Sequence, residues 1–331
     1  MNNNGIENFY LNGYKTRELK ETMVGVLSQF FEHEEMLSKY WSDAEVLKIF
    51  EMAVRDYNTE NFITNLRSIV NLYQKAYKKS PNKMLDMIVN NYAEFSDGEN
   101  KISCEKESFF NLKNKNLYEQ MVGLMGFSER LLEIAIKPAV AELVVCLKLS
   151  ECGQINYKSI RNANFGCNIK KLIDETAIGN LFQLNPNNVN FSDWRNIACH
   201  SDYSINQDME ITCRFKQKTF TLNNEEFNLY IKQIKQTNNV LGLARMIFIY
   251  DYFDVIYSYT TKNCPEIISK LFIINSCKSS RLKYSLASQG YKVLKISDEE
   301  TMITVDLQDL TNTSASTLEY KKSRWTQIDV T

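Results

Sequence analysis

The sequence predicts a mainly α-helical protein, and three observations support this. The chain has 331 residues but only 11 Gly and 4 Pro, so few residues suit the tight turns of a many-stranded sandwich or barrel. Aromatic residues make up 12% of the chain, which excludes intrinsic disorder. Apolar residues recur at spacings of three and four along most of the chain, as in amphipathic helices.

The N-terminal third is expected to be a helical domain. From about residue 16 to 95 the apolar spacing is regular, as in Leu66 and Ile69. The stretch SDGENKIS at 96–103 is polar, contains Gly98 and has no apolar period, which indicates a break between two units. We therefore assign residues 1–115 to an N-terminal helical domain.

A second helical domain is expected over residues 116–260. Its first helical pattern, at 117–150, contains Pro138. Proline removes one backbone donor and clashes with the carbonyl of Ile134, so we expect a kink or a split there. The remaining elements of this domain are predicted as a helix near 168–183, a helix capped by Ser192, a short β-hairpin at 209–222 and a long apolar helix at 224–259.

The last part of the chain, residues 261–331, is predicted to be a small α/β segment. YKVLKIS and TMITVDL have the pattern of strands, and the helical KSSRLKYSLAS precedes them.

Charge and cysteine usage exclude several function classes. The 39 Lys and Arg nearly balance the 40 Asp and Glu, so bulk electrostatics does not predict a protein that coats nucleic acid. The 8 Cys contain no C-x-x-C pair and suggest reduced thiols. The first twenty residues lack a signal-peptide core, and charges or Pro interrupt the longest apolar stretches. We expect a cytoplasmic protein without membrane spans.

One short motif carries candidate chemistry: Arg195 and Asn196 are followed by His200, giving R-N-x-x-x-H near the start of a predicted helix. On a helix Asn196 and His200 share a face, whereas Arg195 lies about 140° from His200 and reaches the same site only through its long side chain. One helix thus makes an incomplete pocket. Two copies facing each other across a two-fold axis would complete it, which requires an isologous homodimer.

RNIACH resembles the R-x(4-6)-H signature of the HEPN superfamily, helical ribonucleases of prokaryotic toxin and antiviral systems. The resemblance covers residues 117–260 and implies a HEPN-like helical bundle. It also implies metal-independent RNA cleavage, in which the 2'-hydroxyl attacks the adjacent phosphate and leaves a 2',3'-cyclic phosphate and a 5'-hydroxyl. The expected biological role is that of a toxin or an antiphage effector acting by abortive infection.

The residues of the motif suit this chemistry. The His200 imidazole is of the type that exchanges protons near neutral pH. Arg195 keeps its charge and can bind phosphate oxygens as negative charge builds up. Asn196 can orient the imidazole or donate to the phosphate. No Asp or Glu cluster has metal-site spacing, so we expect neither metal nor cofactor.

Other residues are candidates for supporting roles. Family members often carry a polar residue on an earlier helix, and Glu142 is a candidate, although a Glu on an amphipathic helix is usually solvated. Tyr203 lies three positions after His200, whereas family toxins with a nucleotidyltransferase antitoxin carry His-x-Tyr, so regulation by adenylylation is in doubt. The basic residues of the predicted hairpin could bind RNA phosphates or form a solvated strand face: Arg214, Lys216 and Lys218.

The apolar neighbours of the motif, Trp194 and Ile197, are predicted to be core residues that turn the polar side chains outward. The aromatic residues between 248 and 259 could stack bases, but their helical spacing favours a core or dimer interface. His33 is predicted to be a surface residue.

A non-catalytic function is the alternative. The near-neutral charge and the unexplained flanking segments also suit a helical RNA-binding or protein-binding subunit of a defence or toxin–antitoxin complex. Besides RNA and a second copy of the chain, an antitoxin or defence-complex subunit is therefore a candidate partner.

Overall fold

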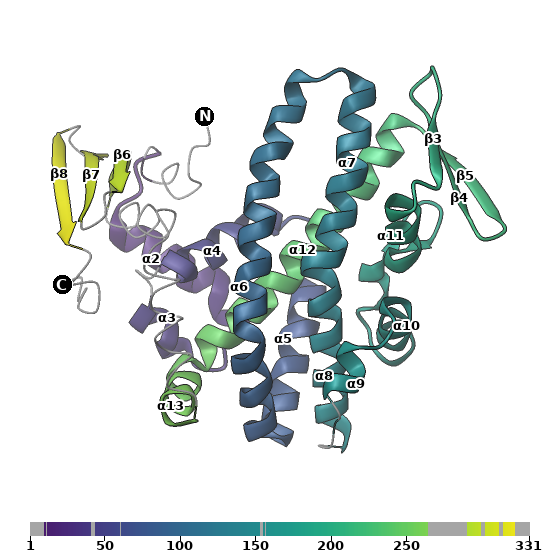
Figure 1. Ribbon diagram of the computed structural model, residues 1–331. Helices are drawn as coiled ribbons and strands as arrows, with labels where there is room; N and C mark the ends of the chain where they lie inside the picture. Colours follow the sequence, from purple (N-terminus) through teal and green to yellow (C-terminus); the bar gives the residue numbers. More distant parts are fainter. Residues whose placement is uncertain are drawn as a thin grey trace. The chain divides into compact units, whose positions relative to one another are not determined.

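A computed structural model describes residues 10, 12–40, 44–59, 61–152, 155, 157–263, 290–298, 302–310 and 314–321. The protein is mainly helical and contains small antiparallel sheets (Figure 1), which confirms the predicted fold class at this level. It divides into two compact units, Thr59–Arg245 and the pair of segments Met1–Asn58 and Met246–Thr331. These bounds differ from the domain boundaries predicted near residues 115 and 260.

The unit Thr59–Arg245 is a bundle in which α6 and α7 form a long hairpin, α5 packs on α8, and α11 packs on α7 and α10 (Figure 1). Its described helices are α5 (Phe62–Lys79), α6 (Pro81–Asn111), α7 (Leu117–Leu131), a π-helix (Leu132–Ile136), α8 (Lys137–Cys152), α9 (Tyr157–Arg161), α10 (Phe165–Glu175), α11 (Phe191–Cys199) and α12 (Asn224–Asp251), which continues into the other unit. Short 3-10 helices lie at Leu112–Asn114 and Gly179–Phe182.

The core follows the apolar spacing of the sequence. On α5 the residues Leu66, Ile69 and Tyr73 are almost fully buried, as the period of three and four predicts. On α11, Trp194 and Ile197 are also completely buried, which confirms that they are core residues.

The split predicted at Pro138 is wrong, because the helical run continues without a gap from α7 through the π-helix, which ends two residues before the proline, into α8. Single π-turns inside a helix widen it and change the direction of its side chains. Helix α6 passes this turn closely, because an ideal Cβ on Gly98 would lie 3.1 Å from the carbonyl oxygen of Ile134.

Two small sheets belong to this unit. β1 (Gln183–Leu184) and β2 (Val189–Asn190) form a short antiparallel pair. β4 (Ile211–Phe215) and β5 (Lys218–Leu222) form the predicted hairpin, and β3 (Tyr203–Ile205) adds a strand that was not predicted, with Tyr203 opposite Cys213.

The other unit is built from α2 (Thr16–Leu27), a 3-10 turn (Ser28–Phe30), α3 (Glu34–Tyr40), α4 (Ala44–Asp56), the end of α12, α13 (Phe253–Asn263), and β6 (Tyr291–Asp298), β7 (Met302–Asp309) and β8 (Ala315–Lys321). The three strands form an antiparallel sheet in the order β6-β7-β8. The predicted strands YKVLKIS and TMITVDL are confirmed as β6 and β7. The helix predicted at 278–288 lies outside the described residues.

The Asp251 carboxylate joins two parts of this unit. It accepts hydrogen bonds from the backbone N–H groups of Glu32 (3.0 Å) and His33 (2.8 Å) ahead of α3, and it lies 3.1 Å from His33 Nδ1. The Asp251 side chain is fully buried, and 43% of the His33 side chain is exposed. His33 is therefore tied to a buried carboxylate, and the prediction of a plain surface residue was incomplete.

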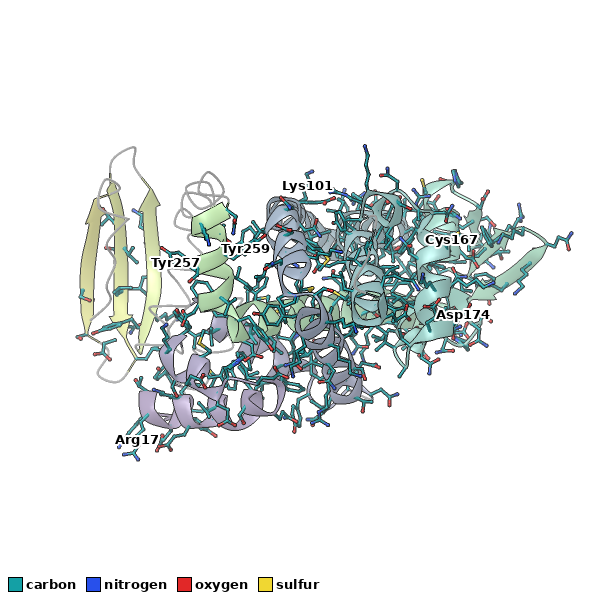
Figure 2. All side chains as sticks on the ribbon, turned by 90° about the horizontal axis from the view of Figure 1, so that it is seen from below. Arg17, Lys101, Cys167, Asp174, Tyr257 and Tyr259 are labelled. Carbon is teal, nitrogen blue, oxygen red and sulfur yellow. The ribbon has the colours of Figure 1, made fainter. Side chains whose placement is uncertain are left out.

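The break predicted at residues 96–103 is wrong, because this stretch lies inside α6. Gly98 and Ile102 are buried, while Lys101 is exposed (Figure 2). This stretch therefore continues α6, with one side buried and the other exposed to solvent.

Three further bounds differ from the predictions. The helix near 168–183 is α10 followed by a 3-10 turn, and the exposed Cys167 and Asp174 lie on it (Figure 2). The long helix at 224–259 is divided into α12 and α13 at Tyr252. No helix among the described residues is long and apolar enough to cross a membrane.

Candidate functional site

Helix α11 carries the R-N-x-x-x-H motif, and its first turn is capped by Asn190. The Asn190 Oδ1 atom accepts from the backbone N–H of Asp193 at 2.9 Å and from the Ser192 hydroxyl at 2.7 Å. The cap is therefore Asn190, and the prediction of Ser192 was wrong. An Asn at this position satisfies a backbone donor that the helix cannot pair internally.

The orientation of α11 about its axis is fixed by Trp194. Its indole N–H donates to Ser128 Oγ on α7 over 3.1 Å, and its ring packs edge-on against Tyr230 of α12 with centroids 5.2 Å apart. With Trp194 directed into the core, the next two residues, Arg195 and Asn196, come out half-buried at the surface of the helix.

The Arg195 guanidinium is held by two acceptors. Nη1 donates to Asn196 Oδ1 at 3.0 Å, and Nη2 donates to Glu133 Oε1. The remaining nitrogen, Nε, is buried and has no hydrogen-bond partner among the described residues. Arg195 and Asn196 thus act as one polar unit, and these two bonds use two of the five N–H donors of the guanidinium.

Glu133 is the residue that the sequence did not reveal. It lies in the π-helix, and Lys137 donates to its second oxygen, Oε2, at 2.8 Å. Burial acts to raise the pKa of Glu133, but the Lys137 ammonium and the Arg195 guanidinium outweigh it and leave the pKa below its ordinary value. The only local sequence signal is the Glu–Lys spacing of four, and nothing in it points to a residue 62 positions away.

His200 ends α11 as its C-cap, with φ −92° and ψ 3°. Its backbone N–H still donates to the Asn196 carbonyl at 3.0 Å, so the predicted i, i+4 relation is kept at the helix end. The chain then turns through Ser201, at φ 55°, and Asp202 N–H returns to the Ile197 carbonyl at 3.0 Å. This closure is a Schellman motif. The His200 imidazole is exposed.

Glu142 does not join this cluster. Its side chain is completely buried in α8, where it accepts from Tyr73 Oη (2.7 Å), Asn91 Nδ2 (3.0 Å) and Arg245 Nε (2.9 Å). The predicted alternative, a solvated Glu, is also wrong. The carboxylate that meets Arg195 comes from the same helical stretch but is Glu133.

Tyr203 lies at the start of β3, close after the motif. It is half-buried, and this burial raises the pKa of Tyr203 above its ordinary value.

The basic hairpin residues differ in their surroundings. Arg214 and Lys218 are exposed on β4 and β5. Lys216 lies in the turn at φ 54°, with Nζ 4.6 Å from the centroid of the Phe215 ring and 3.9 Å from Asp193 Oδ1. Burial raises the pKa of Asp193, while Lys216 and Lys218 oppose that shift. The hairpin turn therefore brings positive charge to the first turn of α11.

Among the residues that the structure describes, no group of three or more His, Cys, Asp or Glu side chains is arranged to hold a metal ion. No protein-family model, curated protein or solved structure matches this chain.

Proposed function

We propose that the protein is a HEPN-type endoribonuclease that cleaves RNA without a metal ion and acts as a homodimer. One observation carries the proposal: Arg195, Asn196 and His200 lie at the surface of α11 and at its C-cap, while Trp194 on the same helix is buried in the core. Cleavage of a phosphodiester bond requires groups that bind the phosphate and groups that transfer protons. A guanidinium and an amide can bind the phosphate, and an imidazole can transfer protons.

The proposed reaction is an internal transesterification. The ribose 2'-hydroxyl loses its proton and attacks the phosphorus, the bond from phosphorus to the 5'-oxygen breaks, and that oxygen takes up a proton. His200 serves one of the two proton transfers, and Arg195 stabilises the negative charge that builds up on the phosphate oxygens. A second copy of the chain supplies the other imidazole, so that one histidine accepts a proton while its counterpart donates one.

A cleavage assay tests this proposal. Purified protein in EDTA is incubated with total tRNA and a labelled single-stranded RNA, and the product ends are identified. We expect 2',3'-cyclic phosphate ends, and a loss of at least about 100-fold in rate for His200→Ala and for Arg195→Ala. Cleavage by both variants at the parent rate would show that the catalytic assignment is wrong.

Matched controls separate catalysis from folding. His33→Asn alters the only other histidine, which is tied to Asp251 outside the Thr59–Arg245 unit. Arg17→Ala alters an arginine whose side chain is 88% exposed. Both variants are expected to cleave like the parent.

The assembly and the biological role are tested separately. Light scattering should give the mass of a dimer, and a strict monomer would contradict the composite site. Expression of the parent should arrest bacterial growth, and His200→Ala should relieve the arrest. RNA binding without cleavage by the parent would favour the alternative of a non-catalytic binding subunit.

A further inference from the structure

Two cations converge on one carboxylate beside the motif. The Arg195 guanidinium binds Oε1 of Glu133, and the Lys137 ammonium binds Oε2 at 2.8 Å. The three residues come from α11, the π-helix and the first turn of α8, all within one compact unit. Their side chains are 29%, 21% and 42% exposed for Arg195, Glu133 and Lys137, so this cluster reaches the surface.

The charges in the cluster do not cancel. One carboxylate faces two fixed cations, which leaves one positive charge. In addition, Arg195 Nε is a buried donor with no partner among the described residues. A phosphodiester carries the same single negative charge as a carboxylate and shares it over two oxygens in the same way, and guanidinium groups bind both anions through the same fork.

We propose that the Glu133 carboxylate occupies the place of an RNA phosphate in the RNA-free protein, and that RNA displaces it to bind Arg195 and Lys137. This inference rests on the proposed ribonuclease function and extends it in two ways. It assigns Lys137 as a phosphate-binding residue, and it makes Glu133 a competitor that masks the catalytic arginine until RNA arrives.

A permanent structural ion pair predicts the opposite response. If Glu133 only held Arg195 in its productive orientation, neutralising Glu133 would release the guanidinium and weaken RNA binding. If Glu133 competes with phosphate, the same change must strengthen RNA binding. The sign of the effect therefore distinguishes the two roles.

The experiment measures the binding of a fluorescein-labelled single-stranded RNA between 50 and 300 mM NaCl in the His200→Ala background, so that RNA is not cleaved. We expect Glu133→Gln to lower the Kd by about tenfold and Lys137→Gln to raise it by about the same factor, as for a charged hydrogen bond gained or lost. Lys137→Gln should also reduce the slope of log K against log salt by about 0.7, the value for one phosphate contact on a single strand. Lys137→Arg should restore both properties.

Lys148 and Glu151 provide the matched control. They form a Lys–Glu pair at 2.8 Å on the same helix, two turns or more from Lys137. Lys148→Gln and Glu151→Gln are expected to leave the Kd within about twofold of the parent, since exposed pairs contribute little.

Each outcome supports or overturns the proposed roles of Glu133 and Lys137. An unchanged or higher Kd for Glu133→Gln, or a Lys137→Gln variant that binds like Lys148→Gln, overturns this inference, while RNA cleavage by the parent leaves the ribonuclease function intact. No RNA binding even at 50 mM NaCl overturns the inference, and if the parent also fails to cleave RNA, the proposed function is overturned with it. Circular dichroism confirms folding, and if Glu133→Gln does not fold, the Lys137→Gln and Lys137→Arg pair decides alone.

Discussion

The buried indole N–H of Trp194 donates to the buried hydroxyl of Ser128 over 3.1 Å. This bond crosses from α11 to α7 and fixes which residues of α11 face outward. The motif residue next in sequence, Arg195, is outward because Trp194 is inward. The geometry of the candidate site therefore depends on a polar contact inside the core.

Removing the Ser128 hydroxyl should lower the stability of the protein. In Ser128→Ala the Trp194 N–H stays buried without an acceptor, so the free energy of unfolding should fall by about 1–3 kcal/mol in urea titrations. Ser150→Ala removes a half-buried hydroxyl that donates to the Leu147 carbonyl of its own helix, and it should change stability by no more than about 0.5 kcal/mol. Equal effects of the two substitutions would contradict this account.

Ser201, which follows His200, should be improved by glycine. Its φ of 55° is the left-handed conformation that closes the Schellman motif, and a side chain there is strained. Ser201→Gly should raise the unfolding free energy by about 0.5–1 kcal/mol, because the left-handed cost of a side chain exceeds the extra chain entropy of glycine. The control Ser204→Gly, in an exposed strand position, should lower it by a similar amount. A lower melting temperature for Ser201→Gly would argue against strain at this position.

The Glu133 ion pairs should make stability depend on pH. Because the folded-state pKa of Glu133 lies below its unfolded value, its contribution is complete above the unfolded pKa of about 4.3 and is lost as the pH falls through the folded pKa. At pH 7 the parent should exceed Glu133→Gln by about 1–2 kcal/mol. Urea titrations should show this gap closing below about pH 4, and a gap independent of pH would count against the ion pairs.

Asp251 and Asp254 form a natural pair for comparison. Asp251 is buried and accepts the N–H groups of Glu32 and His33, whereas Asp254 is half exposed and bound by Lys39. Asp251→Ala should cost about 2–3 kcal/mol, with faster amide exchange at residues 32 and 33. Asp254→Ala should cost less than about 1 kcal/mol. If both substitutions lowered the free energy of unfolding equally, the backbone hydrogen bonds to Asp251 would not account for its contribution to stability.

Local signals in the sequence predicted much of the fold. The apolar period of α5 and the alternation of β4 and β5 each reflect one buried face, and both elements were predicted. The stretch at 96–103 was misjudged because Gly98 suggests a turn when the sequence is considered alone. In the structure Gly98 has no turn to make, and its missing side chain lets α6 approach the Ile134 carbonyl. This role of Gly98 depends on a contact with a residue far away in the sequence, so the residues around it do not reveal it.

The candidate site was predictable only in part. Arg195, Asn196 and His200 are close in sequence, so helical spacing places them. The partner of Arg195, Glu133, comes from the π-helix, and no residue pattern in the sequence predicts a π-helix there. Glu142 and Glu133 are both glutamates upstream of the motif, and only the packing shows that one faces the core and the other faces Arg195.

The buried Glu142 is expected to act on stability and not on catalysis. It is completely buried and paired with Arg245 at 2.9 Å, so Glu142→Gln removes one charge of a buried ion pair and should cost about 3–5 kcal/mol. The double variant Glu142→Leu with Arg245→Met removes both charges and should recover most of that loss in urea titrations. Because Arg195 bonds Glu133 and not Glu142, the proposed RNA cleavage per folded molecule should match that of the parent in the double variant. A folded double variant that has lost cleavage would instead place Glu142 in the catalytic machinery.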